Sequence, residues 1–222
     1  MKETDLDNEQ GTVKERILQE ALYLFSERGF EGTSLQAIAD AVGIQKPSLI
    51  YHFPSKEDLR RHVLASLVTY WKNELPRILT PEDSGPDRLV STMTSLINFF
   101  LEDINRARLV VREILDRPEE TFALFSEHFS PWTRLIGDYL RMGQQSGLYR
   151  TDVDPESFIV QVLVMVVGAV AMGSTTSGMV STDSFTLRGR LIKELVRIVQ
   201  ASLYTEYPQK ISESKKMNRR TT

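Results

Sequence analysis

Apolar residues recur at three- and four-residue spacings along almost the whole chain of 222 residues, and this periodicity constrains the fold more than any other feature. In residues 12–28, for example, Ile17, Ala21 and Leu24 lie on one face of a helix. Strict alternation of polar and apolar residues, which marks half-buried strands, never lasts for more than a few residues. We therefore predict an all-α fold.

Two short helical patterns joined by one glycine follow, in the stretch SLQAIADAVGIQKPSLIYHFPSKEDL at residues 34–59. The first pattern places Leu35, Ile38 and Val42 on one face, and Gly43 can adopt the positive φ of a tight turn. Two short helices docked on a longer first helix make a helix-turn-helix unit, whose second helix enters the major groove of DNA. This stretch therefore points to nucleic-acid recognition.

The second short helix carries polar side chains that suit such a role. Leu49 and Phe53 lie one turn apart and form its expected inward face, so the polar residues around them face outward or lie at the edges. These outward residues are Gln45, Lys46, Ser48, Tyr51 and His52. Lysine and glutamine have favourable pairings with guanine and adenine edges, respectively. Backbone N–H groups at the starts of the second and fourth helices could hold phosphates, helped by Ser34 and Lys56.

Longer helical patterns fill the rest of the chain. The fourth helix is expected to run to Pro76, and the segment PEDSGPD at 81–87 is typical of a loop. Two dipeptides, Ser130-Pro131 and Asp154-Pro155, each pair a capping residue with a proline at the first helical position and so indicate helix starts. The remaining helices are expected at about 87–103, 105–117, 119–129, 130–146, 155–173 and 184–204.

The chain resembles the tetracycline-repressor (TetR) family of bacterial transcription regulators. The resemblance covers about residues 14–62 and is carried by RILQEALYLFSERGFEGTSL, IADAVGIQKPSLIYHF and PSKEDL. Beyond them, only the broad layout matches, with helices to the C-terminus and DVDPE before an apolar penultimate helix. The resemblance implies a disordered segment at 1–11, a helix-turn-helix DNA-binding domain at 12–62, a helical ligand-binding and dimerisation domain at 63–207 and a basic flexible tail at 208–222.

The resemblance also implies which residues meet DNA. The start of the second helix would bind a phosphate through Ser34 and reach a base edge through Gln36, and the fourth helix would meet a phosphate through Lys56. The base-reading helix would contribute Gln45, Lys46, Pro47, Ser48, Tyr51 and His52. One position departs from the family pattern, because Ile50 stands where the family usually has a phosphate-contacting tyrosine. Tyr51 follows it, about 100° further around the helix.

The charge of this region excludes a coat that binds DNA without sequence preference. Residues 12–62 hold seven Lys or Arg and seven Asp or Glu, a net charge of zero, and the whole chain has a formal net charge of −3. Such a coat would be far more basic. A docking face built from a few placed cations, helix termini and neutral donors needs no bulk charge, so we expect modest non-specific affinity and low salt sensitivity.

A single helix-turn-helix unit reads few base pairs, so we expect a homodimer on a pseudo-palindromic double-stranded operator. The run FIVQVLVMVVGAVAMG at 158–173 is apolar all round, is interrupted by Gln161, and is shorter than the ~20 residues that a membrane crossing needs. Such a helix requires cover from two directions, which the family supplies with a second subunit. The candidate dimer residues are Val160, Val164, Val167, Ala171, Leu191, Leu195 and Ile198. A monomeric core is the alternative, since periodicity does not distinguish a partner from the chain itself.

Aromatic and methionine side chains are frequent in the middle helices. Core packing explains each of them singly, whereas together they also suit an adaptable apolar pocket. The resemblance implies a small, largely apolar effector there, which would release the repressor from its operator. The candidate pocket residues are Trp71, Phe99, Phe100, Phe125, Phe129, Met142 and Met165.

Other classes of protein fit the sequence less well. None of the three histidines, His52, His62 and His128, has a glutamate three residues before it, and no phosphate-loop, dinucleotide-binding or G-x-S-x-G pattern occurs. We therefore expect no enzyme activity, metal or cofactor. A helical adaptor that binds a protein partner through its apolar C-terminal helices is the alternative, but it leaves the polar second helix unexplained. The absence of Cys favours a reducing interior, and MKETDLDNEQ has no apolar signal core that would direct secretion. Together with the family resemblance, these features lead us to expect a bacterial cytoplasmic protein without a membrane segment.

Overall fold

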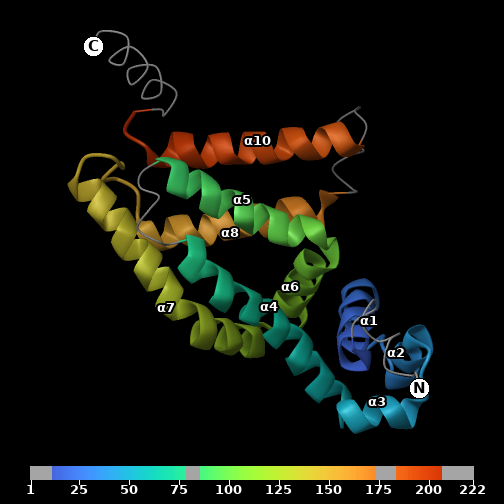
Figure 1. Cartoon of the computed structure of the whole chain (residues 1–222). Coiled ribbons are helices and arrows are strands. Elements are labelled where there is room, and N and C mark those ends of the chain that lie inside the picture. Colours follow the sequence, from blue (N-terminus) through green and yellow to red (C-terminus); the bar gives the residue numbers. More distant parts are fainter. Residues whose placement is uncertain (1–11, 79–85, 174–183, 207–222) are drawn as a thin grey trace, which may run out of the picture. The chain divides into compact units, whose positions relative to one another are not determined.

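The computed structural model describes residues 12–78, 86–173 and 184–206. The described part of the chain is helical, and its one β feature is an isolated bridge between Tyr149 and Tyr204. The helices are α1 (Val13–Arg28), α2 (Leu35–Val42), α3 (Lys46–His52), α4 (Lys56–Ile78), α5 (Pro86–Glu102), α6 (Ile104–Asp116), α7 (Pro118–Gln145), α8 (Pro155–Ala171) and α10 (Ser184–Leu203) (Figure 1). The prediction of an all-α fold is confirmed.

The helices divide into two compact units. The first unit comprises Met1–Arg77 and Asp103–Pro118, so that α6 joins α1–α4 although α5 separates them in the sequence. The second unit comprises Ile78–Glu102 and Glu119–Thr222. The boundary at residue 62 separates the predicted DNA-binding domain from the predicted ligand-binding and dimerisation domain, and it stays a prediction.

Side-chain caps explain where the first helices begin and end. Thr12 caps α1 and forms a capping box with Glu15, whose carboxylate accepts the Thr12 N–H at 2.7 Å. Ser34 caps α2 by accepting the N–H of Ala37 at 3.1 Å. At the other end of α2, Gly43 adopts φ 77° and ψ 33°, the left-handed conformation that glycine allows at little cost. The predicted turn at Gly43 is confirmed.

In the first unit, α2 packs against both α1 and α3. The core includes Ile17, Phe25 and Ile38, and α1 packs against both α2 and α6. The α3 side chains of Leu49 and the following Phe53 have no exposed surface at all. The prediction that these two residues anchor the second short helix from behind is therefore confirmed.

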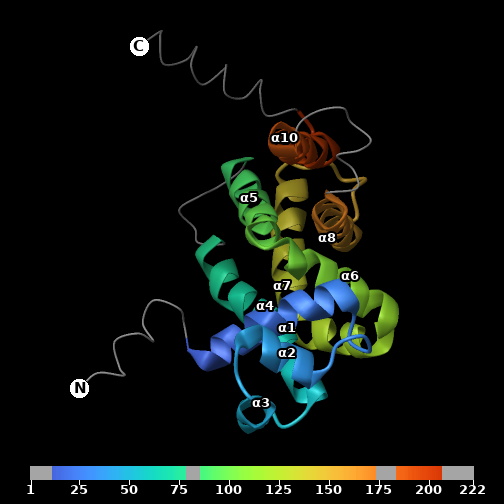
Figure 2. The same ribbon diagram turned by 90° about the vertical axis from the view of Figure 1, so that its right-hand side faces the viewer.

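In the second unit, α5, α8 and α10 pack against one another (Figures 1 and 2). The turn between α7 and α8 holds the end of α10, since the Arg150 N–H donates to the Leu203 carbonyl at 2.9 Å. The ring of Tyr149 lies against Gly143, where an added Cβ would come within 2.0 Å of it. None of the helices that the structure describes in either unit has the length and apolar character of a membrane crossing.

The helix starts predicted at Ser130-Pro131 and Asp154-Pro155 have different outcomes. Asp154 does cap α8, accepting the Ser157 N–H at 2.9 Å. Hydrogen bonds from the Ser157 side chain and then from its backbone lower the pKa of the Asp154 carboxyl. The helix start predicted at Ser130-Pro131 is wrong, because α7 runs through Pro131 without a break. The Ser130 carbonyl there accepts hydrogen bonds from the Thr133 hydroxyl at 3.1 Å and from Arg134 Nε at 3.3 Å. Pro131 has no N–H, so the Glu127 carbonyl one turn earlier lacks its helical donor.

Candidate nucleic-acid interface

The exposed side of α3 is the candidate site. With Leu49 and Phe53 buried behind it, the helix presents Lys46, Pro47 and Ser48 to solvent at its N-terminal end. Gln45 is the N-cap residue but makes no side-chain capping hydrogen bond, so its amide is available to a ligand. Pro47 lies in the first turn, where its missing N–H costs nothing. The structure thus brings together the side chains that the sequence assigns to base reading.

The C-terminal end of α3 carries the aromatic part of the site. Tyr51 is 85% exposed, and its ring meets the ring of His52 edge-to-face, with centroids 5.4 Å apart. His52 is half-buried, whereas Ile50, at the position of the usual family tyrosine, is 40% exposed. The Tyr51 hydroxyl therefore lies on this surface, but it projects from position 51 and not from position 50, where the family usually has its tyrosine.

The start of α2 offers a second group of donors beside α3. Ser34 is exposed at the N-terminus of α2, where backbone N–H groups and the helix dipole favour an anion. Gln36 is exposed as well, but its amide donates to the Asp40 carboxylate at 2.7 Å. This bond uses one of the two N–H donors of the Gln36 amide and leaves its carbonyl oxygen unused.

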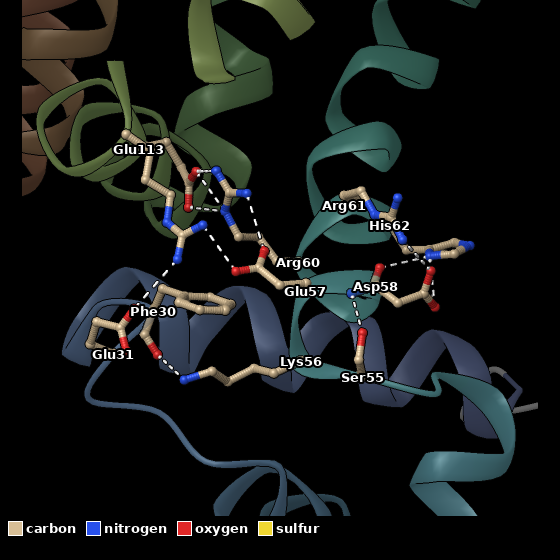
Figure 3. Close-up of polar contacts among 11 residues, drawn as sticks. Phe30, Glu31, Ser55, Lys56, Glu57, Asp58, Arg60, Arg61, His62 and Glu113 are labelled. Carbon is tan, nitrogen blue, oxygen red and sulfur yellow. Dashed lines mark hydrogen bonds and ion pairs between the residues drawn. The ribbon is translucent and has the colours of Figure 1, made fainter. Parts of the chain in front are cut away.

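Lys56 differs from the other predicted contact residues. Its ammonium group donates to the backbone carbonyl of Phe30 at 2.9 Å (Figure 3) and to that of Thr33 at 3.1 Å. The same nitrogen lies 4.1 Å from the centre of the Phe30 ring. Its charge is therefore directed into the first unit, and the phosphate contact that the resemblance implies stays a prediction.

The seven cations of residues 12–62 fall into three groups. Three are held inside the first unit: Lys56 as just described, Arg16 through the Val42 carbonyl at 2.5 Å, and Arg60 through a buried carboxylate. Arg61 forms a surface pair with Asp58 at 3.2 Å. The other three have no hydrogen-bonded or ionic partner among the described residues; they are Lys14, Arg28 and Lys46. Only Lys46 among them lies on α3.

A buried cluster of charges lies behind the site. The guanidinium group of Arg60 donates two hydrogen bonds to the carboxylate of Glu113 on α6, from Nε to Oε1 at 3.1 Å and from Nη2 to Oε2 at 2.5 Å. Both side chains, drawn in Figure 3, are only 5% exposed. Arg117, also on the α6 side, stacks 4.3 Å from the Phe30 ring centre and pairs with Glu57 at 3.0 Å. Sequence analysis missed this cluster, because nothing local links residue 60 to residue 113.

The predicted pocket residues are spread over both units. Trp71 belongs to the first unit and is buried, whereas the other six belong to the second. Phe99 and Phe100 are buried, and Phe125 and Phe129 are half-buried with ring centres 5.6 Å apart. Met165 is half-buried and Met142 is 59% exposed.

The predicted dimer residues separate into an exposed and a covered set. Val160 and Val164 are 54% and 60% exposed, and Ile198 on α10 is 42% exposed. Val167 is buried within the chain, and Ala171 and Leu195 are half-buried. The Leu191 side chain lies outside the described residues. Leu163, which sequence analysis missed, is 43% exposed and joins Val160 and Val164 on one face, since the three are spaced three and four residues apart.

The geometry of α1–α3 defines a helix-turn-helix protein. In comparisons with known proteins, "Bacterial regulatory proteins, tetR family" matches residues 17–63, and "Tetracyclin repressor-like, C-terminal domain" matches residues 86–191. The chain belongs to the TetR family of bacterial transcriptional regulators.

Curated relatives match the N-terminal part of the chain. The icaADBC biofilm operon negative regulator IcaR of Staphylococcus aureus is 41% identical over 110 residues, which cover 49% of this chain and 56% of the relative. IcaR of Staphylococcus epidermidis is 38% identical over 65 residues, which cover 29% of this chain and 35% of the relative. The chain thus spans about half, or less, of the length of the curated relatives it matches.

Solved structures share the fold over most of the chain. The ketosteroid transcriptional regulator KstR2 of Mycobacterium tuberculosis matches with a TM-score of 0.69 at 19% identity, over 88% of this chain and 97% of that one. A putative transcriptional regulator from Saccharomonospora viridis, solved with choline, matches with a TM-score of 0.64 at 21% identity, over 87% of this chain and 98% of that one. These likenesses support the fold.

Proposed function

We propose that this protein is a homodimeric repressor that binds a double-stranded DNA operator through α3 and leaves it when a small, largely apolar ligand binds. The observation that carries the proposal is the two-sided character of α3. Its Leu49 side has no exposed surface, while Lys46, Ser48 and Tyr51 are exposed on the other side. A helix anchored in this way is rigid enough to present side chains to the major groove.

The roles within the site follow from chemistry. Lys46 and Gln45 would read base edges, since an ammonium group suits guanine O6 and N7 and an amide suits adenine N6 and N7. Ser48 would donate to either base, and Tyr51 and His52 would contact the sugar-phosphate backbone or adjacent bases. At the start of α2, the N–H groups with Ser34 would hold a phosphate, and Gln36 would reach a neighbouring base. Pro47 would pack against the groove and fix the first turn of α3.

The second copy of the chain would cover the exposed apolar face of the second unit. Val160, Leu163 and Val164 form this face on α8, and Ile198 is the corresponding exposed residue on α10. Exposed apolar surface of this kind gains free energy when a partner removes it from water. A twofold dimer would also supply the second α3 that a pseudo-palindromic operator requires.

The proposal also covers the sign of regulation and the release of DNA when a ligand binds. IcaR, the relative that is 41% identical over 110 residues, is named a negative regulator, and we propose the same sign for this chain. An apolar ligand held by the Phe and Met residues of the second unit would favour the state that does not fit the operator. A coupling of about 1–3 kcal/mol would weaken operator affinity by roughly 5- to 150-fold. The protein would then act in the bacterial cytoplasm, where its DNA lies.

The proposal is tested with the protein and the DNA upstream of its own gene. We expect a gel shift with this DNA, a nuclease footprint with two protected half-sites, and a dimer by light scattering. Small molecules that raise the melting temperature should then release the DNA. A dimer that retains no DNA fragment from its own genome would contradict the proposal and favour an adaptor that uses α8 and α10.

A further inference from the structure

We infer that Lys14, in the first turn of α1, is a further DNA-contacting residue, which neutralises a phosphate beside the C-terminal end of α3. The inference rests on the proposed function and deepens it. It adds α1 to the elements that meet DNA, and each protomer of the proposed dimer would contribute one such contact.

The charge of Lys14 is not used within the first unit. Lys14, Arg28 and Lys46 are the cations of residues 12–62 that have no hydrogen-bonded or ionic partner among the described residues. The Lys14 side chain is exposed, so the three N–H donors of its ammonium group are available to a ligand. Unpaired lysines are common on protein surfaces, and the position of Lys14 therefore decides whether it has a role.

Lys14 lies beside the end of α3. Its ammonium nitrogen is 5.7 Å from the centre of the ring of Phe53, the buried C-cap residue that directly follows His52. This distance is close to the limit of about 6 Å for attraction between a cation and a ring, and the ring takes up none of the N–H donors. The two ends of α3 thus each carry an unpaired cation, Lys46 at the start and Lys14 at the end.

The C-terminal end of α3 is where a DNA phosphate is expected. In a helix-turn-helix complex, the N-terminal residues of the second helix contact the base edges. With seven residues, α3 is about 10 Å long, and the major groove is about 8.5 Å deep. A helix that enters the groove by its start therefore has its end near the level of the phosphates that border the groove. A cation beside this end is within reach of one of them.

The stability of α1 does not account for a lysine at this position. The unpaired N–H groups and the dipole of a helix make its first turn favourable for anions and unfavourable for cations. Glu15, the next residue, suits this turn and closes the capping box with Thr12. Arg28 lies in the last turn of α1, where the dipole favours a cation. The fold thus accounts for the charge of Arg28 but not for that of Lys14.

The test compares Lys14→Met with Arg28→Met in the full chain. Each variant loses one exposed positive charge of α1 and keeps a long apolar stem, so that Lys14→Met still covers Phe53. The two positions are about 21 Å apart along the helix. Affinity for the operator, and for a fragment of equal length without it, is measured by fluorescence anisotropy over a series of KCl concentrations at a temperature where all variants are folded.

For Lys14→Met we expect a slope of log affinity against log salt that is lower by about 0.9–1.8, because each phosphate contact adds about 0.9 and a dimer loses one or two. Operator affinity at about 0.1 M KCl should then fall by about 8- to 60-fold. The fragment without the operator should lose affinity by a similar factor, since a phosphate contact carries no sequence information. Arg28→Met should keep the parental slope.

A parental salt slope in Lys14→Met would overturn the inference. An equal fall of the slope in Arg28→Met would do so too, because overall charge and not a contact would then explain the effect. A loss of affinity confined to the operator would overturn the phosphate contact in favour of base reading. If the parent itself binds no operator, the proposed function fails and the inference fails with it, whereas a parent that binds and a variant with the parental slope refute the inference alone.

Discussion

The exposed face of α3 and the charged cluster around Phe30, formed by Lys56, Arg60, Glu113 and Arg117, use the same residue types in opposite ways. On α3, Lys46 is exposed and has no ionic partner among the described residues. In the cluster, Arg60 and Glu113 are each 5% exposed. Lys56 donates to the carbonyls of Phe30 and Thr33, and Arg117 lies over the Phe30 ring. Charge on α3 is exposed to solvent, whereas in the cluster it joins residues of different helices.

The difference shows why net charge says little about a DNA reader. Residues 12–62 balance to zero, yet the balance hides cations that are committed to the interior. A buried ion pair contributes little net stability over an apolar pair, but it is costly to break because one charge is left without compensation. An exposed lysine has the reverse profile, since its loss affects a bound ligand and hardly affects the fold. The two regions should therefore respond to mutation in opposite ways.

Glu113→Gln is expected to have the largest effect. It leaves the buried Arg60 guanidinium group without its carboxylate, which should lower the free energy of unfolding by about 3–5 kcal/mol. Urea denaturation measures this loss. In the double variant Arg60→Met/Glu113→Leu, which removes both charges, most of the stability should return. An equally large loss in the double variant would show that packing, and not the uncompensated charge, explains the effect.

Lys46→Ala should reverse that pattern. Operator affinity should fall by about 1–3 kcal/mol, roughly 5- to 150-fold, because one base contact is lost. The melting temperature should stay at the parental value, since Lys46 makes no contact that holds the fold. Fluorescence anisotropy with a labelled operator measures the affinity. Parental affinity in this variant would remove Lys46 from the interface.

Gly43→Ala should have a smaller effect that touches both properties. Residue 43 has φ 77°, and no atom lies within 4 Å of an added Cβ, so strain alone sets the cost. We expect a loss of about 1–2 kcal/mol in unfolding free energy. Gly43→Asn should lose less, because asparagine tolerates this conformation better. Equal losses in the two variants would mean that backbone strain at the turn is not the cause.

Arg61→Ala should have the smallest effect and sharpens the contrast with its neighbour Arg60. Arg61 is 72% exposed and pairs with Asp58 at 3.2 Å. Exposed pairs of this kind contribute about 0–1 kcal/mol, and we expect a change in urea stability below about 0.5 kcal/mol. A loss that approaches that of Glu113→Gln would contradict the distinction between exposed and buried charges.

Local signals made much of the first unit predictable. The helix at 12–28, the turn at Gly43 and the buried pair Leu49 and Phe53 all lie within a few residues of the pattern that predicts them. The exposed set on α3 follows from that pair by helical geometry. Periodicity was sufficient here because each feature depends on neighbours in the sequence.

Long-range contacts explain what the sequence did not reveal. The partners of Lys56 are 26 and 23 residues away, and Glu113 is 53 residues from Arg60, so no pattern predicts how these charges are used. Ser130-Pro131 has the local pattern of a helix start, yet α7 continues through it. Similarly, Val167 belongs to an apolar run, but only packing within the chain decides that it is covered while Val164 is exposed.

The central claim is that α3 lies in the major groove, and the most direct measurement is methylation of guanine N7, an atom that faces this groove. The operator, saturated with protein, is treated with dimethyl sulfate, and the reactive guanines are mapped. The account predicts guanines protected in two half-sites by the parent, with at least one of them reactive again in Lys46→Ala at equal occupancy. A saturated operator in which every guanine N7 reacts as it does in free DNA would contradict the account.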